Sequence, residues 1–233
     1  MKRLMECVPN YSEGRDKSVI DAIANAIAAE GVKILNVDPG EGTNRTVITF
    51  IGEPDVVCEA AFQGAKKSQE LIDMRLHHGI HPRSGATDVL PLVPVSGITL
   101  QECAGHARAL AKRLWEELGN PCYCYEAAAF KPEHKNLASC RAGEYEALPW
   151  KMLHGDKPDF GPADGQMNET IAKCGASNVG ARNYLIAVTS TLIQKIPNLQ
   201  WKWQGRCAKR ATPECPAPSR AARPTAGTFP NTG

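Results

Sequence analysis

The order of apolar patterns along the chain is the feature that most constrains its fold. Extended runs rich in β-branched and apolar residues alternate with stretches whose apolar residues recur at helical spacing. Strands are expected at residues 4–8, 32–37, 45–52, 88–95 and 120–127, and helices at residues 16–30, 54–75, 99–118 and 137–148. Residues 151–171 are expected to be mostly loop, and residues 175–187 a turn that leads into a strand or helix. The natural packing for this order is a mixed sheet with helices on one face, so the sequence predicts an α/β (α+β) protein.

End signals support the helix assignments. Asp16 stands near the start of the first expected helix and Gly31 just past its end. Thr99 and Glu102 form a capping-box pattern, and Gly119 is a plausible stop for that helix. The resulting order, β-α-β-β-α-β-α-β, contains the split βαβ pattern of ferredoxin-like folds, extended by further elements.

Residues 71–95, LIDMRLHHGIHPRSGATDVLPLVPV, join a helical pattern to an extended one through a cation-rich turn. Pro82 biases His81 away from helical dihedrals, so this imidazole is expected on a stiff loop ahead of a strand, a common place for catalytic groups. A histidine there suits general acid/base work, which needs a proton-transfer group with a pKa near neutral. His77 and His78 fit a solvated, basic helix end instead. The prolines that follow fit an edge strand or an irregular one.

The turn at residues 38–44, DPGEGTN, gathers polar side chains between two expected strands. It fits an ordinary hairpin connection, and it equally fits a grip on a polar ligand by Asp38, Asn44 and the adjacent Arg45. Its glycine spacing is not that of a phosphate loop, because it has no G-K-[ST] and no helix follows.

Charge and hydropathy bound the partners of the chain. Its 233 residues carry a net charge of +2. Residues 188–233 hold seven Lys or Arg and one Glu, so the remainder carries a net charge of −4. A mildly acidic globular part gives no case for nucleic acid as a partner. No stretch approaches the apolar length of a membrane span, so no membrane partner is expected.

The nine cysteines are scattered, with no C-x-x-C pair and no zinc-finger spacing, so no metal is expected. Their odd number, and an N-terminus without the apolar segment of a secretory signal, favour a reduced cytoplasm. Cys122 and Cys124 alternate with two tyrosines. This pattern predicts core thiols that share one face of a strand.

Seven blocks of the sequence resemble the glutamate formimidoyltransferase family, whose domain also forms the first part of formimidoyltransferase-cyclodeaminases. The blocks are ECVPNYSEG, NVDPGEGTNRTVITFIG, LIDMRLHHGIHPRSGATDVLPLVPV, YCYEAAA, RAGEYEAL, PDFGP and GARNYLIA. The resemblance implies an enzyme of histidine degradation that moves the formimino group of N-formimino-L-glutamate to N5 of tetrahydrofolate, the co-substrate, without a metal. It also implies two ferredoxin-like subdomains with folate bound in the cleft between them.

The resemblance further implies site residues. The family's essential histidine falls on His81 as general acid/base, and the acidic residue of its V-D-x-G turn falls on Asp38. Asp38 could orient the imidazole or hold the attacking amine. Guanidinium groups bind carboxylates in bidentate fashion, so arginines are candidates for the carboxylates of substrate and folate. The full set of substrate- or folate-binding candidates is Asn10, Asn44, Arg45, Arg83, Asp159, Phe160, Gly161, Pro162 and Arg182.

The chain departs from the family after residue 187. The expected organisation is an N-terminal formiminotransferase subdomain at residues 1–180, the start of a truncated second subdomain at 181–199, and a disordered tail at 200–233, with the rest of the second subdomain missing. An out-of-frame tail from a frameshift near codon 188 is favoured over a genuine alternative C-terminus and over a basic, aromatic arm.

The expected truncation leaves a second function class open beside the enzyme. The chain as written is expected to be weakly active or inactive alone. It could then be a non-catalytic folate-binding remnant, or a half-enzyme that needs a separate second subdomain. Whether it forms a homodimer also stays open.

Overall fold

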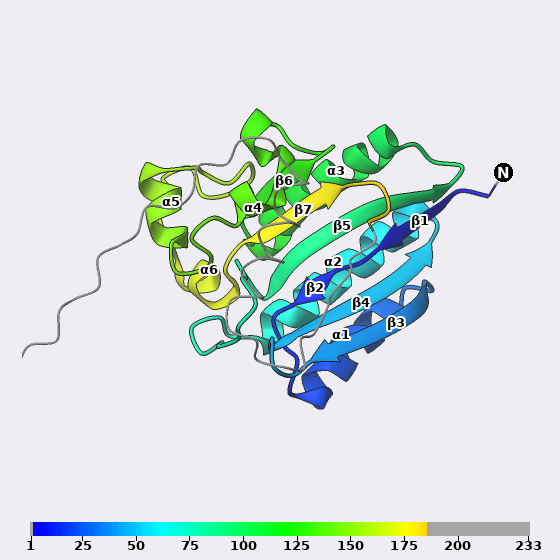
Figure 1. Cartoon of the computed structure of the whole chain (residues 1–233), viewed down its shortest axis with the longest axis horizontal. Helices are drawn as coiled ribbons and strands as arrows, with labels where there is room; N and C mark the ends of the chain where they lie inside the picture. The colour runs from blue at the N-terminus through cyan, green and yellow to red at the C-terminus, as the bar shows by residue number, and fades with distance from the viewer. Residues whose placement is uncertain (1, 186–233) are drawn as a thin grey trace, which may run out of the picture. The chain divides into compact units, whose positions relative to one another are not determined.

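The computed structural model describes residues 2–185. The predictions made for residues 200–233, and for most of residues 181–199, lie outside the described residues. Seven strands form one mixed sheet, shown face-on in Figure 1. Their bounds are β1 Leu4–Cys7, β2 Asn10–Tyr11, β3 Lys33–Gly40, β4 Arg45–Gly52, β5 Thr87–Ser96, β6 Cys122–Glu126 and β7 Ser177–Ala181.

The first part of the sheet has the ferredoxin-like strand order. β3 pairs with β4, β4 pairs with both β1 and β2, and these two pair with β5, all antiparallel. Val8 and Pro9 separate β1 from β2, which continue the same line between β4 and β5. Beyond β5 the sheet continues through two parallel pairings, β5 with β7 and β7 with β6. The predicted mixed sheet is confirmed.

Three long helices pack on one face of this sheet, α1 Lys17–Ala28, α2 Pro54–Leu71 and α3 Leu100–Leu118. In Figure 1, α1 and α2 lie behind strands β1 to β4. Along β4, Thr46, Ile48 and Phe50 are buried, while the residues between them are only partly covered. The face of β4 opposite the long helices is therefore the open face, and we call this side of the sheet its second face. The predicted caps are confirmed, since Asp16 caps α1 and Thr99 and Glu102 form a capping box on α3.

Smaller helices cover the second face at the β6 end of the sheet. Cys122 and Cys124 of β6 are buried in the main core, as predicted, while Tyr123 and Tyr125 point to a second cluster. Leu148, Met152 and Ile171 contribute to that cluster. The short helices are η1 Pro132–Lys135, α4 Leu137–Cys140, α5 Leu148–His154 and α6 Glu169–Cys174.

Two local predictions were wrong. The helix expected to reach residue 75 ends at Leu71, because the backbone turns extended at Ile72. The segment 137–148, expected to be one helix, is helical only over Leu137–Cys140, and a run of turns follows until α5 begins at Leu148. The stretch 151–171 is mostly loop, as predicted, between the end of α5 and the start of α6.

Of the two alternatives predicted for β5, an edge strand or an irregular one, the structure excludes the edge strand, because β5 lies inside the sheet. β7 pairs with the side of β5 that faces away from β1 and β2. On the other side, the carbonyl oxygen of Pro91 accepts the amide of Val8 at 3.3 Å. The alternative prediction of an irregular strand is confirmed by register shifts against both β1 and β2.

Candidate active site

His81 lies on the loop between α2 and β5, as its sequence neighbours predict. Its Nδ1 is 2.7 Å from the carbonyl oxygen of Pro82. A carbonyl can only accept a hydrogen bond, so Nδ1 carries the proton and donates it. Nε2 of the neutral ring then keeps its lone pair. The half-buried imidazole is therefore held as a proton acceptor at one defined nitrogen.

Arg45 reaches the same region from the first residue of β4. Its Nε donates to the side-chain oxygen of Asn10 at 3.0 Å, and its Nη1 donates to Asp88. The Arg45 side chain is 10 % exposed and Asp88 is fully buried. Three strands, β2, β4 and β5, thus place Asn10, Arg45 and Asp88 in one cluster.

A β-bulge in β5 aims Asp88 at this cluster. Tyr11 pairs with Thr87 and Asn10 pairs with Val89, so Asp88 is the extra residue between them. Besides Arg45, its carboxylate accepts the amide of Ser84 at 2.9 Å and Nη1 of Arg141 at 2.8 Å. Two guanidiniums share one carboxylate oxygen, so the cluster keeps one uncompensated positive charge.

This charge acts on the nearby imidazole. Burial lowers the pKa of His81 below its usual value, and the guanidiniums of Arg45 and Arg141 lower it further. The Pro82 carbonyl and Asp88 act in the opposite direction. The balance favours the neutral ring, which is the form that can accept a proton near pH 7.

Arg83 is buried against the neighbouring segment. It binds Glu146 through two nitrogens, at 2.6 and 2.8 Å, and Glu144 at 3.1 Å. Hydrogen bonds from Arg83 lower the pKa of Glu146. Its Nε donates to Nδ1 of His77 at 3.3 Å. The structure therefore places Arg83 as an anchor between the His81 loop and residues 144–146.

Asn44 ties the predicted polar turn to the same loop. Its side chain accepts the amide of Gly14 at 3.0 Å and donates to the carbonyl of His78 at 3.0 Å, and its own carbonyl lies 2.9 Å from Nε2 of His77. His77 is buried by this contact. It is not part of a helix end, so that interpretation of His77 was wrong.

Asp38 lies farther from the imidazole than the cluster residues do. It is exposed on β3 and pairs with Val47, which in turn pairs with Asn10. Residues paired directly across strands share a face of the sheet. Asp38 and Asn10 therefore share the open face, two strand spacings or about 10 Å apart.

The other predicted binding residues lie away from this cluster. Phe160 bridges to Cys122 on the outer edge of β6, and the Asp159 carboxylate accepts the amide of Cys124 at 2.7 Å. With Gly161 and Pro162, this loop is three strand spacings from β5, roughly 14 Å. The amide of Arg182 donates to Leu92, four residues along β5 from Asp88 or roughly 13 Å.

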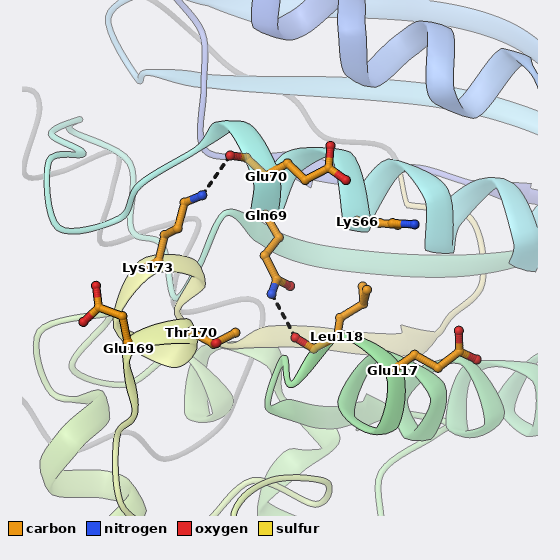
Figure 2. A pocket seen from close by; sticks show the side chains of 8 residues that line it. All are labelled: Lys66, Gln69, Glu70, Glu117, Leu118, Glu169, Thr170 and Lys173. Carbon is orange, nitrogen blue, oxygen red and sulfur yellow. Dashed lines mark hydrogen bonds between the residues drawn. The ribbon is translucent and has the colours of Figure 1, made fainter.

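A pocket of about 450 Å³ lies elsewhere, between the ends of α2 and α3 and the start of α6 (Figure 2). Its walls are tied by hydrogen bonds from Gln69 to Leu118 and from Lys173 to Glu70, 2.9 and 2.8 Å long. The predicted site residues do not line it. Within residues 2–185, no helix is long and apolar enough to cross a membrane, and no three His, Cys, Asp or Glu side chains form a group suited to a metal ion.

Sequence reasoning missed Asp88 and Arg141 as members of the cluster. A charged residue at the head of an otherwise apolar strand was a signal for Asp88, because a buried carboxylate needs partners. Arg141 is separated from Asp88 by 53 positions. Its local pattern, a cation followed by two glutamates, is also typical of a solvated face.

Comparisons with known proteins show what the chain is similar to. A family model described as the formiminotransferase domain, N-terminal subdomain, matches residues 4–182. Formimidoyltransferase-cyclodeaminase of Sus scrofa is 48% identical over 195 residues, which cover 83% of this chain and 35% of the relative. Glutamate formimidoyltransferase of Streptococcus pyogenes serotype M1 is 43% identical over 194 residues, or 82% of this chain and 63% of the relative.

A third relative, glutamate formimidoyltransferase of Thermoplasma acidophilum, is 45% identical over 193 residues, or 81% of this chain and 62% of the relative. The matched region thus spans about a third of the longer relative and less than two-thirds of the two shorter ones. Because the family model covers most of the chain, this protein belongs to the formiminotransferase family, in which it matches the N-terminal subdomain.

Proposed function

We propose that the chain carries the catalytic histidine of a glutamate formimidoyltransferase, with N-formimino-L-glutamate and tetrahydrofolate as substrates. The observation that carries this proposal is the contact of His81, whose Nδ1 is held by the Pro82 carbonyl so that Nε2 is left as the proton acceptor. Burial and two guanidiniums lower the pKa of this imidazole, which favours that role. Two named glutamate formimidoyltransferases at 43% and 45% identity support the reaction class.

The proposed reaction needs one group that moves one proton. N5 of tetrahydrofolate attacks the formimino carbon, a bond between N5 and that carbon forms, and Nε2 of His81 takes the N5 proton. The bond from this carbon to the glutamate nitrogen then breaks, and the imidazolium returns the proton to the departing nitrogen. A base with a pKa near or below neutral suits both steps.

The contacts favour one of the two roles considered for Asp38. The Pro82 carbonyl already orients the imidazole, and Asp38 lies on the open face across two strands. We therefore assign Asp38 to holding the attacking amine. Asn10 and Asn44 are assigned to shaping the site, because both bond within it.

Among the three candidate arginines, the contacts favour Arg45 for a substrate carboxylate. The N–H groups of Arg83 already donate to Glu144, Glu146 and His77. Arg45 instead belongs to a cluster with one more positive than negative charge. The loop from Asp159 to Pro162 and Arg182 are assigned to more distant parts of folate.

A half-enzyme is the second candidate, and one observation favours it. Leu76 and Ile80, on the His81 loop, are 77% and 88% exposed. Apolar side chains so exposed beside a catalytic group suit a surface that a further polypeptide covers. In this version, the chain supplies His81 and a separate second subdomain encloses the ligands.

An assay of the purified full chain with formiminoglutamate and tetrahydrofolate tests both candidates. His81→Ala should lower turnover by about 10²- to 10⁴-fold, the usual contribution of a general acid/base. His78→Ala removes an exposed neighbouring imidazole and serves as the matched control. Turnover that appears only when a second-subdomain polypeptide is added supports the half-enzyme. Equal turnover by His81→Ala and the parent chain refutes the assigned role.

A further inference from the structure

We propose that Arg141 is a positioning residue for His81, acting through the carbonyl of Pro82 and the buried carboxylate of Asp88. This inference deepens the proposed function, since it concerns the same imidazole. It rests on a contact chain that joins three segments far apart in the sequence.

The contact chain runs through a single guanidinium nitrogen. Nη1 of Arg141 lies 2.8 Å from Asp88 and 3.4 Å from the carbonyl oxygen of Pro82. The same carbonyl oxygen accepts Nδ1 of His81 at 2.7 Å. Arg141 therefore fixes the acceptor that in turn fixes the ring, while Asp88 fixes Arg141.

The backbone around Arg141 is itself anchored to the His81 loop. The amide of Tyr145 donates to the carbonyl of Arg83 at 2.9 Å, and Arg83 binds the two glutamates on either side of Tyr145. Arg141 is the C-cap residue of α4, and its side chain is only 19% exposed. Its guanidinium thus enters the cluster from a segment that these hydrogen bonds hold against the His81 loop.

Charge gives Arg141 a second effect on His81. The groups that face the imidazole are Arg45 from β4, Asp88 from β5 and Arg141 from the end of α4. Without the Arg141 charge, the positive charge of Arg45 and the negative charge of Asp88 would largely cancel at the imidazole. The imidazolium would then be less disfavoured, and the pKa of His81 would rise. Nη1 and Nδ1 are at most about 6 Å apart through the shared carbonyl. At that separation, effective dielectric constants between about 20 and 80 give a shift of about 0.5 to 2 pKa units.

The test is an NMR titration of the full chain with ¹⁵N-labelled histidine rings, in which long-range ¹H–¹⁵N spectra report both tautomer and pKa. His81→Asn assigns the His81 signals. In the parent chain we expect one tautomer, with the proton on Nδ1. In Arg141→Met we expect the pKa of His81 to rise by about 0.5 to 2 units, together with a mixture of tautomers.

Two further variants separate positioning from general loss of structure. Arg141→Lys keeps the charge, so its His81 pKa should stay near the parent value, and this variant also serves if Arg141→Met fails to fold. In that case, a mixed tautomer in Arg141→Lys supports the proposal, and an unchanged single tautomer overturns it. Arg108→Met is the matched control, because Arg108 also binds backbone carbonyls, those of residues 127–129, away from His81.

A folded Arg141→Met whose His81 keeps its tautomer and its pKa within about 0.2 unit overturns the proposal. A His81 pKa that rises equally in Arg108→Met also overturns it. The titration needs no turnover, so its result is independent of whether the chain is an active formimidoyltransferase. Where turnover is measurable, the acidic limb of the pH–rate profile of Arg141→Met should move to higher pH by as many units as the pKa of His81 rises.

Discussion

Replacement of Asp88 by Asn should destabilise the protein far more than its small change in shape suggests. Asp88 is fully buried and accepts three donors, two guanidiniums and the amide of Ser84. In Asp88→Asn one side-chain oxygen is replaced by an NH₂ donor, so either the two guanidiniums or the amide of Ser84 loses its acceptor. The positive charges of Arg45 and Arg141 would then lie together without a counter-charge.

The expected cost follows from that lost pairing. Removing one partner of a buried ion pair typically costs about 3–5 kcal/mol. The side chains of Arg45 and Arg141 are 10% and 19% exposed, so water can solvate them in part. We therefore expect the lower end, about 3 kcal/mol, in the free energy of unfolding.

Urea unfolding followed by far-UV circular dichroism measures this cost. Asp21→Asn is the matched control, because it breaks an exposed pair between Asp21 and Lys17 in α1. An exposed pair of this kind should cost less than about 0.5 kcal/mol. A loss below about 1 kcal/mol in Asp88→Asn would show that the shared carboxylate does not hold the two guanidiniums, and would refute the reasoning.

Three other perturbations have defined outcomes. Gly85→Ala should cost about 1–3 kcal/mol by calorimetry, because the added Cβ would lie 2.6 Å from the carbonyl oxygens of Cys174 and Ala176; wild-type stability would contradict this packing. Thr99→Ala should remove about 1 kcal/mol and lower the Tm by about 2–4 °C, through loss of the α3 cap. Burial lowers the pKa of His77, so the unfolded chain binds its proton first and stability should fall as pH drops below about 6.5. His77→Gln should show a weaker pH dependence of urea stability between about pH 7.5 and 5, and an unchanged slope would exclude His77 as the cause.

The three long helices were predictable because their signals are local. Asp16 and Thr99 stand at the helix starts that their capping side chains predict, and Gly119 ends α3 with a φ of 65°. The position of β7 in the sheet was not predictable, because nothing in the sequence of residues 177–181 shows that this strand inserts beside β5. The sequence left open whether β5 is an edge strand for the same reason, since its partner strand β7 comes from about 90 residues away.

The candidate site divides in the same way. His81 and Arg45 stand in conspicuous local contexts, a H-P-R turn and the end of a Gly-rich hairpin. Asp88 acquires its role from a bulge, and a bulge depends on register against β2. Arg141 acquires its role by docking a distant segment on the Pro82 carbonyl. The sequence marks Asp88 as a buried charge, but the partners of Asp88 and of Arg141 are set only when the chain is folded.

The interior position of β7 also sets an order of events during synthesis. Within residues 2–185, β7 is the one strand that pairs with β6, and it follows β6 by some 50 residues. While the ribosome makes the intervening segment, β5 presents an unpaired edge and β6 has no strand partner. Exposed edges of this kind invite pairing with other chains. The nascent protein thus passes through a vulnerable interval that ends only when residues 177–181 emerge, and contacts of such long sequence separation form slowly.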